Sequence, residues 1–164
     1  MISSGAVLEN QQRNIAQAAL GGCGLVIIDP HKSEGYDEVV MKQKITTDKA
    51  PKASGPFSQA IEENGFVFTS GQIYLTPEDK LLEGTIEEQV HQVMKNLGAV
   101  LEAAGTSFKN VVKTTIYVTD MSLYGKVNEV YGSYMSDPYP ARETICVKEL
   151  PRNAKVEISM VATK

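Results

Sequence analysis

Cysteine is scarce in this sequence of 164 residues, and its scarcity excludes a disulfide-rich fold. Only Cys23 and Cys146 are present, one toward each end of the chain. Small secreted scaffolds carry several closely spaced cysteines, whereas two distant ones are typical of free thiols in a reducing compartment. The cysteine content therefore predicts a cytoplasmic protein without disulfides.

Long hydrophobic runs are absent as well. No apolar stretch approaches the roughly 20 residues that a helix needs to span a bilayer, and the longest one near the N-terminus, Leu25 to Ile28, stops at Asp29. No basic segment precedes it. We therefore expect neither a membrane partner nor a secretory signal. A mitochondrial transit peptide has weak support, because residues 1–20 contain a single arginine alongside a single glutamate.

An excess of positive charge is also missing. Sixteen Lys and Arg residues stand against twenty Asp and Glu residues, which gives a formal net charge of -4. Because phosphate backbones are normally bound by a basic face, this balance argues against a nucleic-acid partner. The 42% hydrophobic and 22% charged residues that the chain does have are typical of one globular domain with an ordinary core.

The chain divides into two unequal parts. Residues 1–40 combine a short helical pattern, a glycine cluster and one short apolar run, without an apolar face that could form a core. From Met41 onward the pattern becomes regular. We therefore predict an N-terminal extension of unassigned role over residues 1–40 and one domain over residues 41–164.

The domain opens with a strand-like pattern followed by a helical one. Residues 65–75, "GFVFTSGQIYL", are rich in β-branched and aromatic residues and predict a strand, with a turn and a short return strand over 80–82 after it. Thr85 and Glu88 form a T-x-x-E capping box, which marks the start of a helix. Apolar residues then recur with a 3.6-residue period until Gly105, which makes this the clearest helix in the sequence.

The second half adds a strand, a helix and two further strands, which we expect over residues 111–119, 122–135, 142–148 and 155–163. The resulting order, β(β)αβαββ, predicts an α+β sandwich with two helices on one face of a mostly antiparallel sheet.

The other face of that sheet is predicted to be mixed. In the last strand, the side opposite the aliphatic residues carries Lys155, Glu157, Ser159, Val161 and Thr163. In the strand over 111–119, the corresponding side carries Val111, Lys113, Thr115, Tyr117 and Thr119. A face of this composition suits coverage by another subunit.

Arg142 begins a strand in "YPARETICV" (139–147), although a guanidinium cannot lose its proton. A buried unpaired charge is costly, so the side chain must reach water, pair with a carboxylate or wait for an anionic ligand. Alternation places Arg142 on one face of its strand together with Thr144 and Cys146. If that strand neighbours the last one, Glu157 shares this face, and a structural Arg142–Glu157 ion pair is one interpretation.

Several segments, in order and at the expected spacing, resemble the Rid family, also called YjgF. They are "ASGPFSQAI" (53–61), "FTSGQI" (68–73), "EAAGTSFKNVVKTTIYVTDM" (102–121), "VNEVY" (127–131), "YPARETICV" (139–147) and "LPRNAKVEISMVA" (150–162). The resemblance runs from about Met41 to Lys164 and does not include residues 1–40.

The resemblance implies a chorismate-mutase-like α+β sandwich that assembles as a homotrimer with clefts between subunits. It also implies a 2-iminobutanoate/2-iminopropanoate deaminase, which hydrolyses short-lived enamines and imines such as 2-aminoacrylate to 2-keto acids and ammonia in metabolite damage control. The substrate is a small 2-imino or 2-enamino acid. Neither a metal nor an organic cofactor is expected, because an imine carbon is already electrophilic.

The same resemblance assigns site residues. Arg142 matches the family's P-A-R arginine, which binds the substrate carboxylate, and a guanidinium fork can hold a carboxylate bidentately. Glu157 matches the late-strand glutamate that positions the attacking water. With this match, ligand binding becomes the preferred interpretation of Arg142. Further cleft positions are matched by Ser70, Gly71, Gln72 and Asn128.

Two residues depart from the family pattern. Phe57 stands where a tyrosine commonly follows G-P, so a hydroxyl is missing there. Thr144 stands where a cysteine is often found, so a cysteine nucleophile is not available at that place, although Thr144 can hydrogen-bond a ligand or the backbone. Both departures bear on substrate preference.

Two other functions are open. A non-catalytic trimer could use the same cleft to bind small carboxylates, and the hydroxyl missing at Phe57 favours it. RNA cleavage has been attached to members of the family, but the acidic balance argues against it. No metal site is expected, since the spacing of the acidic and histidine residues fits no metal motif over Asp29, His31, Glu34 and Asp37.

Overall fold

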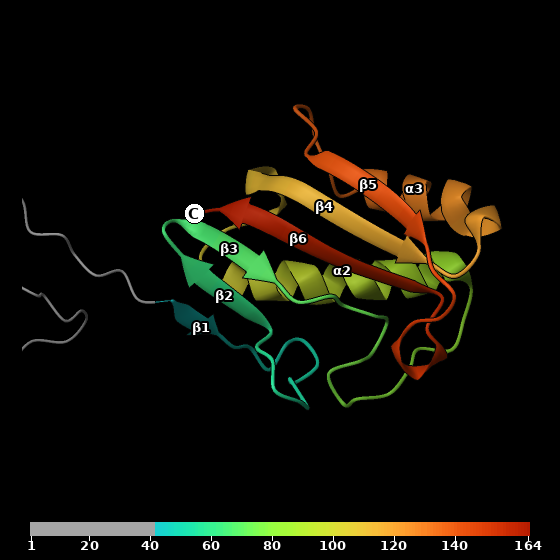
Figure 1. Ribbon diagram of the computed structural model, residues 1–164, viewed down its shortest axis with the longest axis horizontal. Coiled ribbons are helices and arrows are strands. Elements are labelled where there is room, and N and C mark those ends of the chain that lie inside the picture. Colours follow the sequence, from blue (N-terminus) through green and yellow to red (C-terminus); the bar gives the residue numbers. More distant parts are fainter. Residues whose placement is uncertain (1–41) are drawn as a thin grey trace, which may run out of the picture. The chain divides into compact units, whose positions relative to one another are not determined.

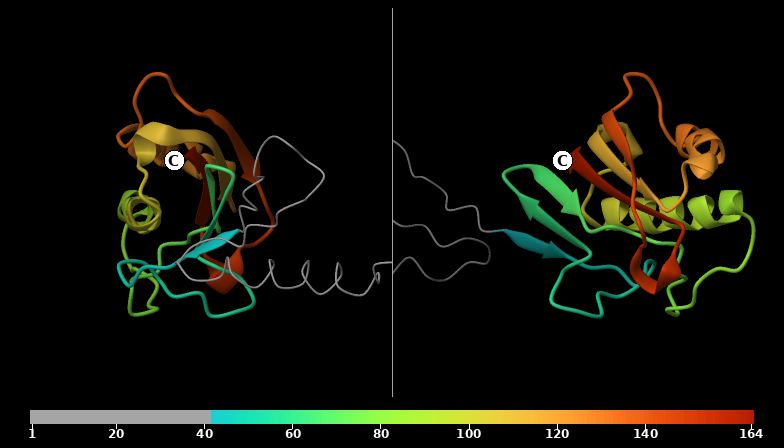
Figure 2. Two further views of the ribbon diagram at one scale, coloured as in Figure 1. Left: turned by 90° about the vertical axis from the view of Figure 1, so that its left-hand side faces the viewer. Right: turned by 45° about the vertical axis from the view of Figure 1, so that its right-hand side comes forward.

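The computed structural model describes residues 42–164, which form one α+β domain (Figure 1). Six strands in this range make a mixed sheet in the order β1-β2-β3-β6-β4-β5, in which only β4 and β5 run parallel. Two α-helices lie on one face of this sheet (Figure 2). The bounds are β1 Gln43–Ile45, β2 Ala60–Glu63, β3 Phe66–Thr69, α2 Ile86–Ala103, β4 Val111–Val118, α3 Tyr124–Gly132, β5 Ala141–Cys146 and β6 Val156–Thr163.

The predicted class, two helices on one face of a mostly antiparallel sheet, is confirmed. The N-terminal extension predicted over residues 1–40 lies outside the described residues, together with the acidic and histidine cluster between Asp29 and Asp37.

Helix α2 begins where its capping box predicts. The Thr85 hydroxyl accepts a hydrogen bond from the Glu88 N–H at 3.3 Å, and the Glu88 carboxylate accepts one from the Thr85 N–H at 2.8 Å. The helix ends just before Gly105, whose φ of +78° lies in the left-handed region that glycine tolerates. Its apolar stripe is buried in the core, as predicted, at Val90, Val93, Met94, Leu97, Val100 and Leu101.

The strands before α2 differ from the prediction. The strand expected over 65–75 ends at Thr69, and it is preceded by β2, with which it forms a hairpin through the two-residue turn Asn64-Gly65. Both turn residues have positive φ, 52° and 76°, as a tight hairpin requires. The return strand expected over 80–82 is only a single bridge between Leu75 and Leu81. Three strands therefore precede α2, where the sequence predicted one or two.

The two long strands bury alternate residues against the helices. In β6 the buried side carries the four aliphatic residues expected, Val156, Ile158, Met160 and Ala162. In β4 a bulge between Val111 and Lys113 shifts the alternation, so Val111 is buried. Its predicted place on the opposite face is therefore wrong.

Neither α-helix of residues 42–164 packs on the opposite face of the sheet, which we call the uncovered face (Figure 2). Exposed Phe66 and Phe68 of β3 lie on it beside the outward side of β6, and exposed Ile145 of β5 lies on it beside Tyr117. This face is mixed, as the alternation predicted.

None of the helices in the described part of the chain is long and apolar enough to cross a membrane.

Candidate functional site

The sheet separates the two residues that the sequence analysis placed together. Strand β4 lies between β5, which carries Arg142, and β6, which carries Glu157 (Figure 1). Arg142 pairs with fully buried Thr114, so it faces the helices. Glu157 pairs with Tyr117 and faces the uncovered side. The expectation that both share one face is therefore wrong, and so is the Arg142–Glu157 ion pair within one chain.

Helix α3 positions Arg142. The guanidinium donates from Nη1 to the Asn128 side-chain oxygen at 2.6 Å and from Nη2 to the Tyr124 hydroxyl at 3.1 Å. It also lies over the Tyr131 ring, 5.2 Å from the centroid. Residues 124, 128 and 131 are spaced i, i+4 and i+7, so they occupy one face of the helix.

The groups that contact Arg142 are all neutral. No ion pair of Arg142 exists within residues 42–164, and its partners there are an amide, a hydroxyl and aromatic rings. A guanidinium has five N–H donors, of which these bonds use two. Three donors and the full charge are therefore left for an anionic ligand.

Asn128 was expected at this site, whereas Tyr124 and Tyr131 were missed. Their signal was available in the sequence, since both stand at helical spacing from Asn128. Thr144 follows two residues after Arg142 on the same face of β5 and pairs with Ile116.

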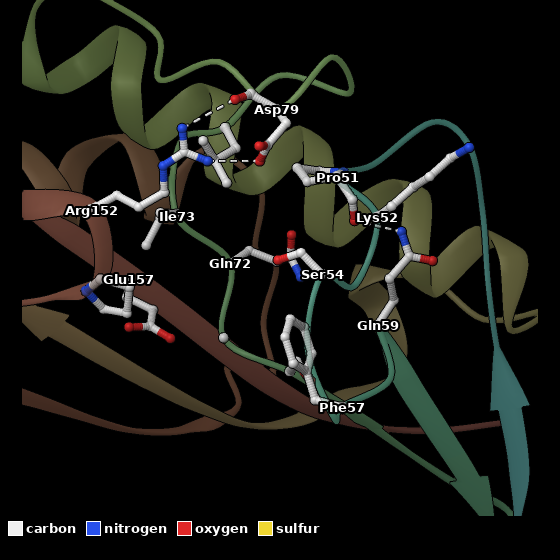
Figure 3. A pocket seen from close by; sticks show the side chains of 14 residues that line it. Pro51, Lys52, Ser54, Phe57, Gln59, Gln72, Ile73, Asp79, Arg152 and Glu157 are labelled. Atoms are coloured by element: carbon white, nitrogen blue, oxygen red, sulfur yellow. Dashed lines mark hydrogen bonds and ion pairs between the residues drawn. The ribbon is translucent and has the colours of Figure 1, made fainter.

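A pocket of about 440 Å³ contains the remaining predicted residues (Figure 3). Its lining brings together Phe57, Ser70, Gly71, Gln72 and Glu157 from three separate segments. Arg142, Asn128 and Thr144 are not among its lining residues. The predicted site is thus divided into two half-sites, which we call the arginine half-site (Arg142 with Tyr124, Asn128 and Tyr131) and the glutamate pocket.

Backbone pairing fixes the glutamate pocket to the last strand. The Gln72 N–H donates to the Ile158 carbonyl at 2.8 Å, and the Ile158 N–H donates back to Gln72 at 3.0 Å. This bridge holds the turn at residues 70–72 beside Glu157. Ser70 is held in turn, because its hydroxyl donates to the Ser58 carbonyl. Phe57 is 52% exposed at the pocket and keeps its ring available to a ligand.

Glu157 is partly buried, and this burial raises the pKa of its carboxyl above the ordinary 4.5. Its carboxylate lies directly against Gly71: a Cβ built on that glycine would meet Oε1 and would come within 2.7 Å of Cδ. Only a residue without a side chain permits this approach. A carboxyl with a raised pKa beside a pocket is suited to take up and return a proton.

An ion pair at the pocket, between Arg152 and Asp79, was not predicted. Arg152 donates from Nη1 to the Asp79 carboxylate at 2.8 Å and from Nη2 to the Asp79 carbonyl at 3.3 Å (Figure 3). Both residues have left-handed backbones, with φ of 57° and 63°. This pair ties together two loops that line the pocket. Nothing in the sequence pattern linked positions so far apart.

Among residues 42–164 no group of three or more His, Cys, Asp or Glu side chains could hold a metal ion.

Comparison with known proteins places this geometry in a family. The family model described as Endoribonuclease L-PSP matches residues 47–164. Reactive Intermediate Deaminase A, chloroplastic, from Arabidopsis thaliana is 47% identical over 76% of this chain and 67% of its own length. The mouse 2-iminobutanoate/2-iminopropanoate deaminase is 43% identical over 76% of this chain and 93% of its own.

Solved structures agree with these relatives. A Thermotoga maritima protein described as a candidate endoribonuclease superposes with a TM-score of 0.74 at 50% identity, covering 76% of this chain and 98% of that one. E. coli TdcF with bound serine has a TM-score of 0.70 at 32% identity, over 74% of this chain and 98% of that one. The chain therefore belongs to the Rid (YjgF) family, whose family model carries the description Endoribonuclease L-PSP.

Proposed function

We propose that this chain is a hydrolytic deaminase of 2-aminoacrylate-type enamines and small 2-imino acids, which releases 2-keto acids and ammonia. One observation carries the proposal: Arg142 is held in place by neutral groups and has no carboxylate partner in the described domain. A fixed guanidinium with its charge uncompensated is a receptor for a carboxylate. The deaminases among the relatives supply the reaction that fits such an anchor.

In this proposal the two half-sites come from two copies of the chain. Arg142 and Glu157 lie on opposite faces of one sheet, so they cannot both contact one small acid within a single subunit. In a homotrimer, the arginine half-site of one subunit meets the glutamate pocket of the next at each of the three clefts. The uncovered sheet face, with Phe66, Phe68 and Ile145 exposed, provides apolar surface for this assembly.

Within the assembled cleft, Arg142 orients the substrate and Glu157 handles protons. The water oxygen attacks C2 of the iminium form, the C=N electron pair moves onto nitrogen, and one water proton passes to Glu157. Glu157 returns that proton to the nitrogen of the carbinolamine. The C–N bond then breaks with its electron pair as ammonia leaves, and the hydroxyl proton is released to solvent as the keto acid forms. An enamine enters after C3 takes up a proton.

The other residues shape the cleft. Gly71 gives the Glu157 carboxylate its place, and Asn128 orients Arg142. Gln72 and Ser70 fix the turn against β6 and the neighbouring loop. Phe57 covers the ligand with its ring. Thr144 lies two residues from Arg142 on its face of β5 and is assigned a hydrogen bond to the ligand or backbone.

Subunit complementation tests the divided site. Arg142→Ala and Glu157→Ala each remove one half-site and are expected to be inactive alone. When the two variants are mixed, unfolded and refolded together, about a quarter of the clefts of a cyclic assembly regain both wild-type residues. Activity should therefore return to about that fraction of the wild type. Two inactive variants that stay inactive after mixing, while sedimentation shows mixed trimers, would contradict the shared cleft.

A binding protein is the second candidate, and the structure of TdcF with bound serine favours it, because that relative holds a small amino acid. The distinguishing measurement is turnover. Imine is generated in place by an amino-acid oxidase, semicarbazide competes for it, and the deaminase diverts it to keto acid. A chain that binds 2-oxobutanoate without accelerating this diversion is a binder. RNA cleavage is not proposed, given the net charge of -4.

A further inference from the structure

Tyr124 differs from the other tyrosine of the arginine half-site in what its hydroxyl does. The Tyr124 hydroxyl accepts from Arg142 Nη2 at 3.1 Å, and its ring centroid lies 5.9 Å from the guanidinium carbon. The Tyr131 hydroxyl instead donates to buried Thr114 at 3.2 Å, inside the core. The Tyr131 ring therefore stacks against the guanidinium, whereas the Tyr124 hydroxyl forms a hydrogen bond with it.

The exposure of Tyr124 shows that its contact with Arg142 does not result from packing in the core. Tyr131 is 4% exposed and Tyr124 is 39% exposed. Tyr124 is the first residue of α3. The turn before it is fixed by Asp120, whose side chain accepts from the Ser122 N–H at 2.8 Å. The start of α3 is therefore held in place independently of Arg142, and it presents the hydroxyl at a defined position.

A long arginine side chain loses rotamer freedom when a ligand must order it, and this loss weakens binding. The Asn128 side-chain oxygen accepts a hydrogen bond from Nη1, and the Tyr124 hydroxyl accepts one from Nη2. Two acceptors on different nitrogens fix both the position and the rotation of the planar group, which a single acceptor cannot do. The guanidinium is then ordered before the ligand arrives.

We propose that Tyr124 is a positioning residue for carboxylate binding: its hydroxyl holds the Nη2 end of Arg142 in the orientation that receives the ligand. This inference rests on the proposed function, in which Arg142 anchors the substrate carboxylate. Tyr124 acts through Arg142 and takes no part in the proton transfers. It therefore affects ligand affinity and leaves the chemical step to Glu157.

The test is Tyr124→Phe, which removes one oxygen and keeps the ring. Tyr139→Phe is the matched control, because Tyr139 is 66% exposed, stands three residues before Arg142, and makes no hydrogen bond through its hydroxyl within the described residues. Both variants are titrated with 2-oxobutanoate by calorimetry and assayed with oxidase-generated imine. Arg142→Ala sets the level of binding without the anchor.

Loss of one hydrogen bond is expected to raise the Kd and KM of Tyr124→Phe about fivefold, with kcat, its pH profile and the Tm unchanged. Tyr139→Phe should match the wild type in every measurement. If Arg142→Ala loses binding while Tyr124→Phe keeps it, or if the two Phe variants lose it equally, Tyr124 has no positioning role. If the wild type binds no better than Arg142→Ala, the proposed function fails, and the inference about Tyr124 fails with it.

Discussion

Replacing Gly71 by alanine should move the Glu157 carboxylate without lowering the stability of the domain. The added Cβ would collide with Oε1 and would lie 2.7 Å from Cδ and 3.0 Å from Cγ of Glu157. Those atoms are the far end of a flexible side chain, so the carboxylate moves and the backbone stays. Gly71 has no positive φ, which leaves the alanine backbone unstrained. We expect the Tm to change little.

The effect on turnover is expected to be large, because a displacement of about 1 Å at a reacting group can lower the rate about a hundredfold. Turnover is measured as the diversion of oxidase-generated imine from semicarbazide, with kcat and KM determined separately. The loss should appear in kcat, since Arg142, the proposed anchor, would still bind the carboxylate.

Gly132→Ala serves as the control for Gly71→Ala, because a Cβ at Gly132, the last residue of α3, meets nothing within 4 Å. It should keep full activity and gain stability, since alanine favours a helix more than glycine does. Full kcat in Gly71→Ala would show that the carboxylate position seen here is not the working one. A Tm lowered by many degrees would assign the loss to misfolding and would equally refute the reasoning.

The remaining predictions concern the pH profile, the anchor, the pocket wall and the extension. Because burial raises the pKa of Glu157 and its ionised form is the active one, kcat should fall on the acid side with a midpoint above pH 4.5, and Glu157→Gln should lower kcat and flatten that limb. Arg142→Lys should raise KM and lower kcat/KM at least tenfold, because a point charge cannot replace a fork; near-normal kinetics would return Arg142 to a structural role. Phe57→Tyr should raise kcat/KM by up to about fivefold, the value of one hydrogen bond, whereas Phe57→Ala should lower it; a wild type that turns over only as Phe57→Tyr would be a binder. A chain that starts at Met41 should fold and keep its activity, measured by circular dichroism and the same imine assay, and an insoluble product would show that the boundary is misplaced.

The sequence predicts those elements whose pattern is long. Helix α2 has 18 residues and β6 has 8, so the apolar pattern repeats several times in each, with a period of 3.6 residues in the helix and 2 in the strand. The hairpin of β2 and β3 was missed because each strand has only four residues. The Asn64-Gly65 turn was visible in the sequence, but the apolar run that continues through residue 75 concealed where the strand ends.

The residues of the candidate site could be proposed one by one from the sequence, but their arrangement in space could not. Alternation shows which residues of one strand share a side, and it placed Arg142 with Thr144 correctly. It does not relate the sides of two strands, because that relation depends on strand order and register. For strand β5 the inner side could not be predicted, because neither of its sides is apolar enough to form part of the core, and none of its residues is buried. Only the pairing of Arg142 with Thr114 and of Glu157 with Tyr117 decides the matter.

Separation by the sheet has a chemical consequence for the proposed two-copy cleft. Two unit charges 4 Å apart attract with about 4 kcal/mol at an effective dielectric constant of 20. That is about the whole binding free energy of a millimolar ligand. If Arg142 and Glu157 shared a face, they would neutralise each other, and a small carboxylate would have to break their pair in order to bind. Held on opposite faces, the guanidinium keeps only neutral partners and the carboxyl keeps its raised pKa. In the proposed cleft, each would therefore arrive without a charged partner from its own subunit, and a substrate between them would contact an available cation and an available base.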